Sequence, residues 1–90
     1  MISVKHLAGD EWTVSVQGAV TTHHRVTVTK AAHARLSEGR APEELLEESF
    51  RFLLEREPNT SILSSFELSL IGRFFPEYEE EICARLRKLA

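Results

Sequence analysis

Hydrophobic and polar positions follow two different periods along this chain, and the period changes near residue 40. In residues 12–16 hydrophobic side chains alternate with polar ones, and residues 25–29 repeat the alternation. A period of two is typical of a strand that buries one face. Together with a strand that begins at Ile2 and a turn at Gly9, these segments predict a two- or three-stranded antiparallel meander in residues 1–30.

Beyond residue 40 the hydrophobic residues recur at helical spacing. Pro42 suits the first position of a helix, where a missing N–H costs nothing. Hydrophobic side chains then recur on one side as far as Leu54, and Pro58 disfavours a helix beyond Glu57. This segment predicts a long amphipathic helix with Phe50 packed against the strands. The opposite side carries charged residues, namely Glu44, Glu47, Glu48, Arg51 and Glu55.

Two further helices are predicted after the long one. Ser64, with Glu67 three residues later, has the form of a capping box, so the first of these helices is expected to begin at Ser64. It has to end or kink at Pro76. The second follows Pro76, and its hydrophobic residues recur from Tyr78 to Leu89 at spacings of four, four and three. Acidic residues at its start and basic residues at its end match the helix dipole.

Together these patterns predict an α+β fold, in which an N-terminal two- or three-stranded antiparallel meander packs against three C-terminal helices. A chain of 90 residues has the size of one domain, because domains typically span about 100–150 residues. We therefore expect a single domain over residues 1–90, with the β meander in residues 1–30 and the helical part in residues 31–90.

The composition narrows the class of protein. With a net charge of −3 and a pI near 5.8, the chain lacks the basic excess that non-specific nucleic-acid binding needs. Its single cysteine excludes a disulfide scaffold. No hydrophobic run approaches the roughly 18 residues of a membrane span, and the N-terminus lacks the hydrophobic core of a signal peptide. We expect a small cytoplasmic protein that does not enter the membrane.

The histidines are candidates for metal binding or proton transfer. His23 and His24 are adjacent, and neighbours on a strand point to opposite faces, so these two do not chelate one metal ion. His6 or His33 would have to join one of them through the fold. Because His24 shares its parity with Val26 and Val28, the pattern predicts a partly buried, hydrogen-bonded core histidine. We expect no metal ion and no cofactor.

Catalytic chemistry has little support in the sequence. A nucleophilic cysteine needs a base and a lowered pKa, whereas Cys83 has the carboxylates of Glu80 and Glu81 as chain neighbours. We expect Cys83 to act as a small hydrophobic residue at the edge of the last helix's hydrophobic stripe. The glycines are scattered singly and form no phosphate-binding loop. We therefore expect no catalytic residue, no enzymatic activity and no small-molecule substrate.

Hydrophobic residues are unusually dense between Ile62 and Tyr78. One face of the predicted helices is used for the intramolecular core, and Leu70 and Phe74 lie four residues apart on a neighbouring side. Either they complete a core shared among three helices, or they form a partner surface, because contiguous exposed hydrophobic patches usually mark contacts. In the second case the simplest partner is a second copy in a homodimer.

The run Ser49–Pro58 (SFRFLLEREP), continued by SIL from Ser61 and by FFPEYE from Phe74, resembles a family of small, functionally uncharacterised bacterial proteins. The resemblance covers roughly the C-terminal half of the chain. It implies a bacterial origin and a compact fold, and it brings no activity and no binding residue with it.

Residues 25–57 resemble a ribbon–helix–helix DNA-binding unit, with a Val-Thr-Val-Thr strand, a short helix and a long amphipathic helix. The resemblance implies that Arg25, Thr27 and Thr29 enter the major groove of DNA from a dimeric two-stranded ribbon. The segment between the strand and the long helix is shorter than the first helix of that family.

These observations predict a small non-catalytic protein-interaction module of a bacterial cytoplasmic protein, whose partner is another protein or a second copy of the chain. Nucleic acid is not expected as a partner of such a module. The alternative is a ribbon–helix–helix-like DNA-binding regulator. Basic residues grouped on an exposed ribbon would favour this alternative.

Overall fold

The computed structural model describes residues 1–89, in which four strands form one sheet in the order β1-β2-β3-β4. The strands are β1 Ile2–Ala8, β2 Glu11–Val16, β3 Thr22–Thr27 and β4 Ser65–Glu67. The first three are consecutive antiparallel neighbours, which confirms the predicted meander, whereas β4 runs parallel to β3. Gly9 joins β1 to β2 with a φ of 53°, in the region that favours glycine.

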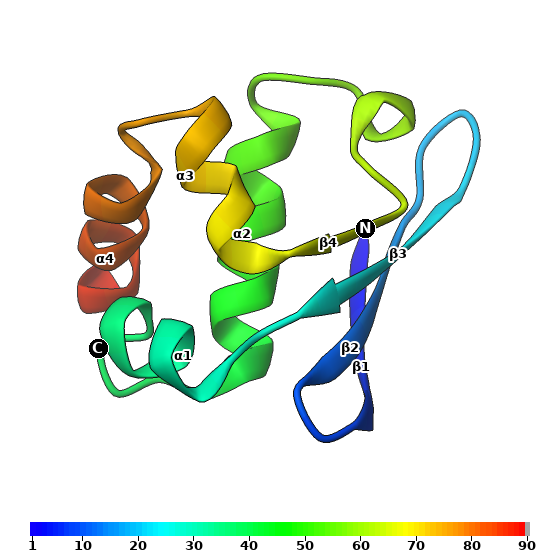
Figure 1. Cartoon of the computed structure of the whole chain (residues 1–90). Coiled ribbons are helices and arrows are strands. Elements are labelled where there is room, and N and C mark those ends of the chain that lie inside the picture. Colours follow the sequence, from blue (N-terminus) through cyan, green and yellow to red (C-terminus); the bar gives the residue numbers. More distant parts are fainter. Residues whose placement is uncertain (90) are drawn as a thin grey trace.

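The helices of the described chain are α1 Lys30–Leu36, α2 Pro42–Leu54, α3 Ile71–Phe74 and α4 Tyr78–Lys88, with the short 3-10 helices η1 Asn59–Ser61 and η2 Leu68–Leu70. The sheet lies to one side of the helices, and α2 lies between the sheet and α4 (Figure 1). This arrangement confirms the predicted α+β fold. Within residues 1–89 no helix combines the length and the hydrophobicity needed to cross a membrane.

One face of the sheet supplies part of the hydrophobic core. In the register of the strands, Val14 lies beside His24, and Val26 lies between Trp12 and Phe66. All of these side chains are buried except that of Phe66, which is partly buried. The period-two pattern of the sequence therefore marks the inner face of β2 and β3 correctly.

Another part of the core comes from α2. Phe50 is fully buried, and its ring centroid lies 5.4 Å from that of His24 and 6.1 Å from that of Phe66. Phe50 and Leu53 belong to one buried cluster with the hydrophobic residues of β2. The predicted packing of this helix against the strands is therefore confirmed.

The polar side of α2 is less exposed than its charge pattern predicted. Glu48 is buried, and its carboxylate forms an ion pair with Arg51, which also pairs with Glu47.

Beside Glu48 in the chain, Ser49 Oγ and Tyr78 Oη form a buried hydrogen bond of 2.7 Å that joins α2 to α4. Burial raises the pKa of the Tyr78 phenol, so this hydroxyl stays neutral.

The helix predicted from Ser64 is wrong over its first part. Ser65–Glu67 form strand β4, and the Arg25 N–H donates a hydrogen bond of 2.8 Å to the Ser64 carbonyl oxygen. The chain becomes helical only at Leu68, and α3 is a single turn that ends before Pro76. Pairing with β3 outweighs the local capping-box signal, because a weak helix preference yields to tertiary contacts.

Helix α1 directly follows the meander and adds one helix to the three that the fold prediction counted. Thr29 precedes its first residue, and the hydroxyl oxygen of Thr29 accepts a hydrogen bond of 3.1 Å from the Ala32 N–H. Threonine is a favoured residue for this capping role. Thr29 is therefore the N-cap of α1 and lies beyond the end of β3, so its expected position within the strand is wrong.

Candidate functional site

An apolar groove of about 270 Å³ opens at the C-terminal end of α2. Its lining comes from the end of α2, the connection between η1 and β4, and the turn from η2 into α3. A cavity of about 150 Å³ lined by hydrophobic side chains can hold a benzene ring, so the groove has room for one bulky hydrophobic side chain. The lining residues are Leu53, Glu57, Ser61, Ile62, Leu63, Phe66, Leu70, Ile71, Phe74 and Phe75.

Exposure increases from the floor of the apolar groove to its rim. Ile71 and Leu53 are buried, and Leu70 is partly buried. At the rim, Leu63 is 50% exposed and Phe74 is 65% exposed. A hydrophobic floor and a hydrophobic rim therefore form one continuous surface that is open to solvent.

Hydrogen bonds to the sheet hold one side of the apolar groove in place. The Asn59 side-chain amide donates to the Val20 carbonyl oxygen at 2.8 Å and to Thr22 Oγ1 at 3.1 Å. His24 continues this network, with Nε2 2.9 Å from Thr22 Oγ1 and Nδ1 2.7 Å from the Leu63 carbonyl oxygen. Because a carbonyl oxygen only accepts, Nδ1 carries the proton and Nε2 accepts from the Thr22 hydroxyl. The predicted hydrogen-bonded core role of His24 is confirmed, and the side chain is more deeply buried than expected. This role positions Leu63 at the rim.

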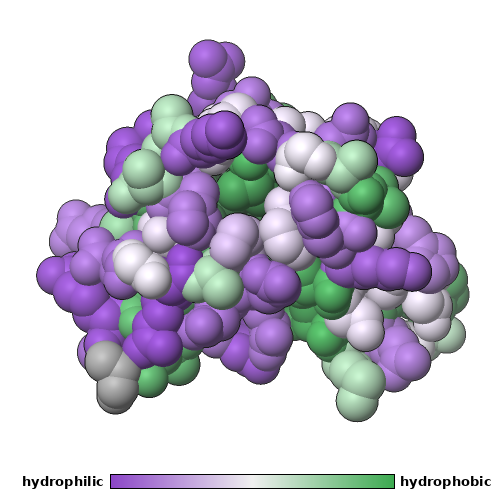
Figure 2. Space-filling view, turned by 90° about the horizontal axis from the view of Figure 1, so that it is seen from below, coloured by the Kyte–Doolittle hydropathy of each residue, from purple (hydrophilic) through white to green (hydrophobic). Residues whose placement is uncertain are grey.

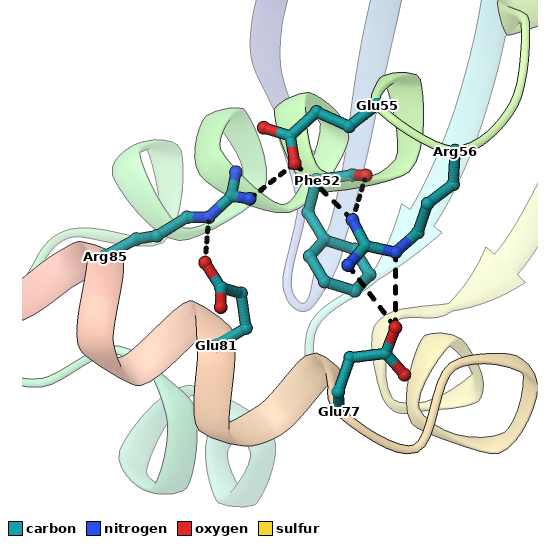
Figure 3. A network of polar contacts seen from close by, with 6 residues as sticks. All are labelled: Phe52, Glu55, Arg56, Glu77, Glu81 and Arg85. Carbon is teal, nitrogen blue, oxygen red and sulfur yellow. Dashed lines mark hydrogen bonds and ion pairs between the residues drawn. The ribbon is translucent and has the colours of Figure 1, made fainter.

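A charged network ties the end of α2 to the start of α4 (Figure 3). The guanidinium carbon of Arg56 lies 3.6 Å from the centroid of the Phe52 ring, and Arg56 donates to the Glu77 carboxylate at 3.3 and 3.4 Å. Arg56 also donates to the Phe52 carbonyl oxygen at 3.1 Å. The centroid of the Phe75 ring, which lines the apolar groove, is 5.8 Å from the same guanidinium. This network therefore joins the segments that precede and follow the groove.

Arg85 extends the network from α4. It donates to Glu55 at 2.6 Å and to Glu81 at 2.9 Å (Figure 3). The hydrogen bond from Arg85 lowers the pKa of the Glu55 carboxyl, and the same bond raises the pKa of Arg85. Both groups are therefore charged at neutral pH, and the pairing sets the position of α4 against α2.

The two residues that the sequence singled out as a partner surface both line the apolar groove. Leu70 is on η2 and Phe74 is on α3, the segment that directly follows η2. Glu57 and Ser61 complete the lining, and the sequence analysis missed both. They belong to a connection whose hydrophobic period carries no signal, so only the fold shows where they lie.

The histidines other than His24 have separate structural roles. His6 Nε2 donates to the Gly9 carbonyl oxygen and His33 Nε2 donates to the Arg40 carbonyl oxygen, each at 2.8 Å. His23 Nδ1 lies 2.9 Å from a serine hydroxyl of β2. Among residues 1–89 no three His, Cys, Asp or Glu side chains are grouped as a metal ion would need.

Cys83 packs at the edge of α4, as predicted from the hydrophobic stripe. Its Sγ is 3.7 Å from the Leu36 carbonyl oxygen, to which the thiol donates weakly. Burial raises the pKa of the thiol, and the nearby Glu38 carboxylate adds to the increase. A raised pKa leaves little thiolate at neutral pH, so Cys83 lacks the activation that a nucleophile requires.

Strand β3 does not provide the ribbon that the DNA-binding resemblance implies. β2 pairs with it on one side and β4 pairs with Arg25–Thr27 on the other, so these residues have no free edge for a strand of a second copy. The Arg25 guanidinium pairs with Glu11 at 3.4 Å, and Thr27 is partly buried. The three candidate DNA contacts are therefore not presented together on an exposed two-stranded ribbon.

Comparisons of this chain with protein-family models, with curated proteins and with solved structures find no match. The two family resemblances described from the sequence therefore remain predictions.

Proposed function

We propose that this chain is a small non-catalytic protein-interaction module, and that its apolar groove binds a bulky hydrophobic side chain of a partner protein. The groove itself carries the proposal, because a hollow of about 270 Å³ has Phe74 65% exposed at its rim. Contiguous hydrophobic surface that remains open on a small protein usually marks a contact site. The bacterial, cytoplasmic setting that the sequence suggests is part of the same proposal.

The other end of α2 offers a useful contrast. Figure 2 views the molecule from the side of the β1–β2 turn and of α1, and hydrophilic residues cover most of that face. Hydrophobic residues appear there as separate patches among polar neighbours. Such scattered patches are normal for a soluble protein, and this contrast supports the groove end as the binding surface.

Binding would rely on hydrophobic burial. The floor residues Leu53 and Ile71 are already buried and packed in the core. A partner side chain that fills the groove therefore leaves water for a hydrophobic site whose floor keeps its position. Burying one such side chain contributes about 1.5–3 kcal/mol. The rim residues Leu63 and Phe74 add further surface around it. A partner that offers a single anchor would therefore bind with modest affinity.

A displayed library of random peptides tests this function. We expect selection on the immobilised chain to enrich peptides with Phe, Trp or Leu at one anchor position. The variant Ser61→Trp places a large side chain in the groove from an exposed position, and it should abolish binding of the selected peptides. Leu7→Glu, at an exposed hydrophobic position in β1, serves as the matched control and should bind as the wild type does. Peptides that bind equally to the Ser61→Trp variant would contradict the proposal.

A further inference from the structure

We infer that the partner seated in the apolar groove is a second copy of this chain, held groove to groove about a two-fold axis. This inference rests on the proposed function and names the partner for the same site. In a two-fold contact one surface has to complement itself, because each residue pair occurs twice with the roles exchanged. The surface around the groove has both a shape and a charge pattern of this kind.

The shape is self-complementary. The groove has room for one bulky hydrophobic side chain, and Phe74 at its rim is such a side chain with 65% of its surface exposed. Each copy therefore supplies both the cavity and the residue that can fill it. Offset or edge-to-face packing of the ring against Phe75 and Phe66 in the other copy matches the preferred geometry of aromatic pairs.

The charges next to the groove are complementary as well. Arg73, the neighbour of Phe74 on α3, is the one arginine that forms no ion pair within the described part of the chain. Glu57, in the groove lining, also forms no ion pair among residues 1–89. In a two-fold dimer, Arg73 of each copy can pair with Glu57 of the other. The groove lining thus carries an anion and an aromatic anchor, and an exposed cation follows next to that anchor in the chain, a combination that a second copy can complement.

The size of this surface indicates a weak dimer. A standard interface covers about 800 Å² per partner, which is roughly 15% of the 5282 Å² surface of one copy. Only Leu63 and Phe74 are strongly exposed among the hydrophobic residues of the groove. We expect a smaller interface than the standard one and a dissociation constant on the order of tens of micromolar.

Sedimentation equilibrium over a range of concentrations tests the inference on the whole chain. The wild type should pass from monomer to dimer, and Phe74→Glu should raise the dissociation constant about tenfold or more, because it places a carboxylate in a hydrophobic contact. Circular dichroism should show an unchanged fold, since the Phe74 side chain is mostly exposed. The matched control Leu7→Glu, with the same change in charge, should dimerise as the wild type does.

A charge exchange tests the two-fold arrangement separately. Arg73→Glu and Glu57→Arg should each weaken the dimer about two- to fivefold, as expected for exposed ion pairs. The double variant should restore the wild-type dissociation constant. A double variant as weak as the sum of the two single changes would overturn the arrangement.

The second-copy inference and the proposed function fail in different ways. A wild type that stays monomeric at several times the expected dissociation constant overturns the second copy as partner. If selected peptides still bind in the groove under these conditions, the interaction module stands with another protein as its partner. If the Ser61→Trp variant still binds those peptides, the groove is not the binding site and both proposals fail.

Discussion

Phe52 and Phe74 are both aromatic residues of the helical part, and their surroundings differ sharply. Phe52 is fully buried, with the guanidinium of Arg56 3.6 Å from its ring centroid and that of Arg85 at 5.6 Å. The ring of Tyr78 packs edge-on against it at 5.3 Å. Phe74 is 65% exposed at the rim of the apolar groove. The comparison shows that charged side chains of this chain cover the hydrophobic ring of Phe52, whereas the ring of Phe74 remains in contact with solvent.

Arg56 and Arg85 can cover the Phe52 ring because carboxylates neutralise their charges. Arg56 and Arg85 hold ion pairs with Glu55, Glu77 and Glu81 while their planar groups lie near the ring (Figure 3). An arginine placed on an aromatic face keeps its charge in a polar network and excludes water from the ring. Next to the groove, Arg73 has no such carboxylate among the described residues, and the hydrophobic surface stays open.

The largest expected effect comes from removing the closed aromatic residue. Phe52→Ala should lower the free energy of unfolding by about 3–5 kcal/mol, because a fully buried ring leaves a cavity. Phe50→Ala, at an equally buried position without arginines, should cost a similar amount and serves as the comparison. Urea unfolding followed by circular dichroism measures both. A Phe52→Ala variant as stable as the wild type would show that the charged network alone holds α2 against α4.

A smaller effect is expected at the hydrogen bond beside Phe52. Tyr78→Phe removes the hydroxyl that pairs with Ser49 Oγ at 2.7 Å and leaves a buried polar atom without a partner. The expected loss is about 1–3 kcal/mol in the free energy of unfolding. Combining it with Ser49→Ala should recover part of this loss, since both polar groups are then gone. Thermal melts of Tyr78→Phe and of the double variant measure their relative stability. A double variant that is less stable than Tyr78→Phe would contradict this prediction.

Removing one of the arginines that cover Phe52 should lower the free energy of unfolding by less than the loss of the Tyr78 hydroxyl. Arg56→Gln should cost about 0.5–2 kcal/mol in the free energy of unfolding, as expected for a partly desolvated cation on an aromatic face. Arg35→Gln, which breaks an exposed ion pair with Glu79, should cost less than about 1 kcal/mol. Equal losses for the two variants, measured by urea unfolding, would mean that the contact with Phe52 adds nothing to the ion pair.

The same network predicts a pH dependence. The Arg85 hydrogen bond lowers the pKa of Glu55 below its ordinary value of 4.5, so the folded state favours the charged carboxylate. The resulting stability is present above pH 4.5 and is lost as the pH falls through the lowered pKa of the folded state. Because Glu55 is exposed to solvent, the effect should stay below about 1 kcal/mol. Unfolding curves of the wild type and Glu55→Gln should differ at neutral pH and converge in acid, and a constant difference would argue against the pair.

The smallest effect on the monomer is expected at the open aromatic residue. Phe74→Ala should change the free energy of unfolding by less than about 0.5 kcal/mol at low concentration, because most of its ring is already in water. Urea unfolding at a concentration well below the dimer dissociation constant checks this. A loss of several kcal/mol would place Phe74 in the core of the monomer and remove the contrast with Phe52.

Local patterns in the sequence predicted much of the fold and part of the candidate site. The period-two segments fall in β2 and at the end of β3, the strand expected from Ile2 became β1, and the helical spacing after Pro42 became α2. The periodicity also left Leu70 and Phe74 on a different side from the core residues, and both line the groove. The capping-box signal at Ser64 was misleading, because the strand that forms there depends on a partner about forty residues earlier in the chain.

The sequence by itself determined that β1 to β3 are strands and that α2 and α4 are helices, and it marked the hydrophobic face of β2, β3 and α2. These properties depend on side chains a few residues apart, and such neighbours are visible in the order of the residues. Only the tertiary structure decided which hydrophobic surfaces are covered. Three contacts join distant parts of the chain, namely the parallel pairing of β4 with β3, the hydrogen bond from His24 to Leu63 and the ion pair of Arg56 with Glu77. Contacts of this kind depend on how the elements pack, and they close the core around Phe52 while the groove beside Phe74 remains open.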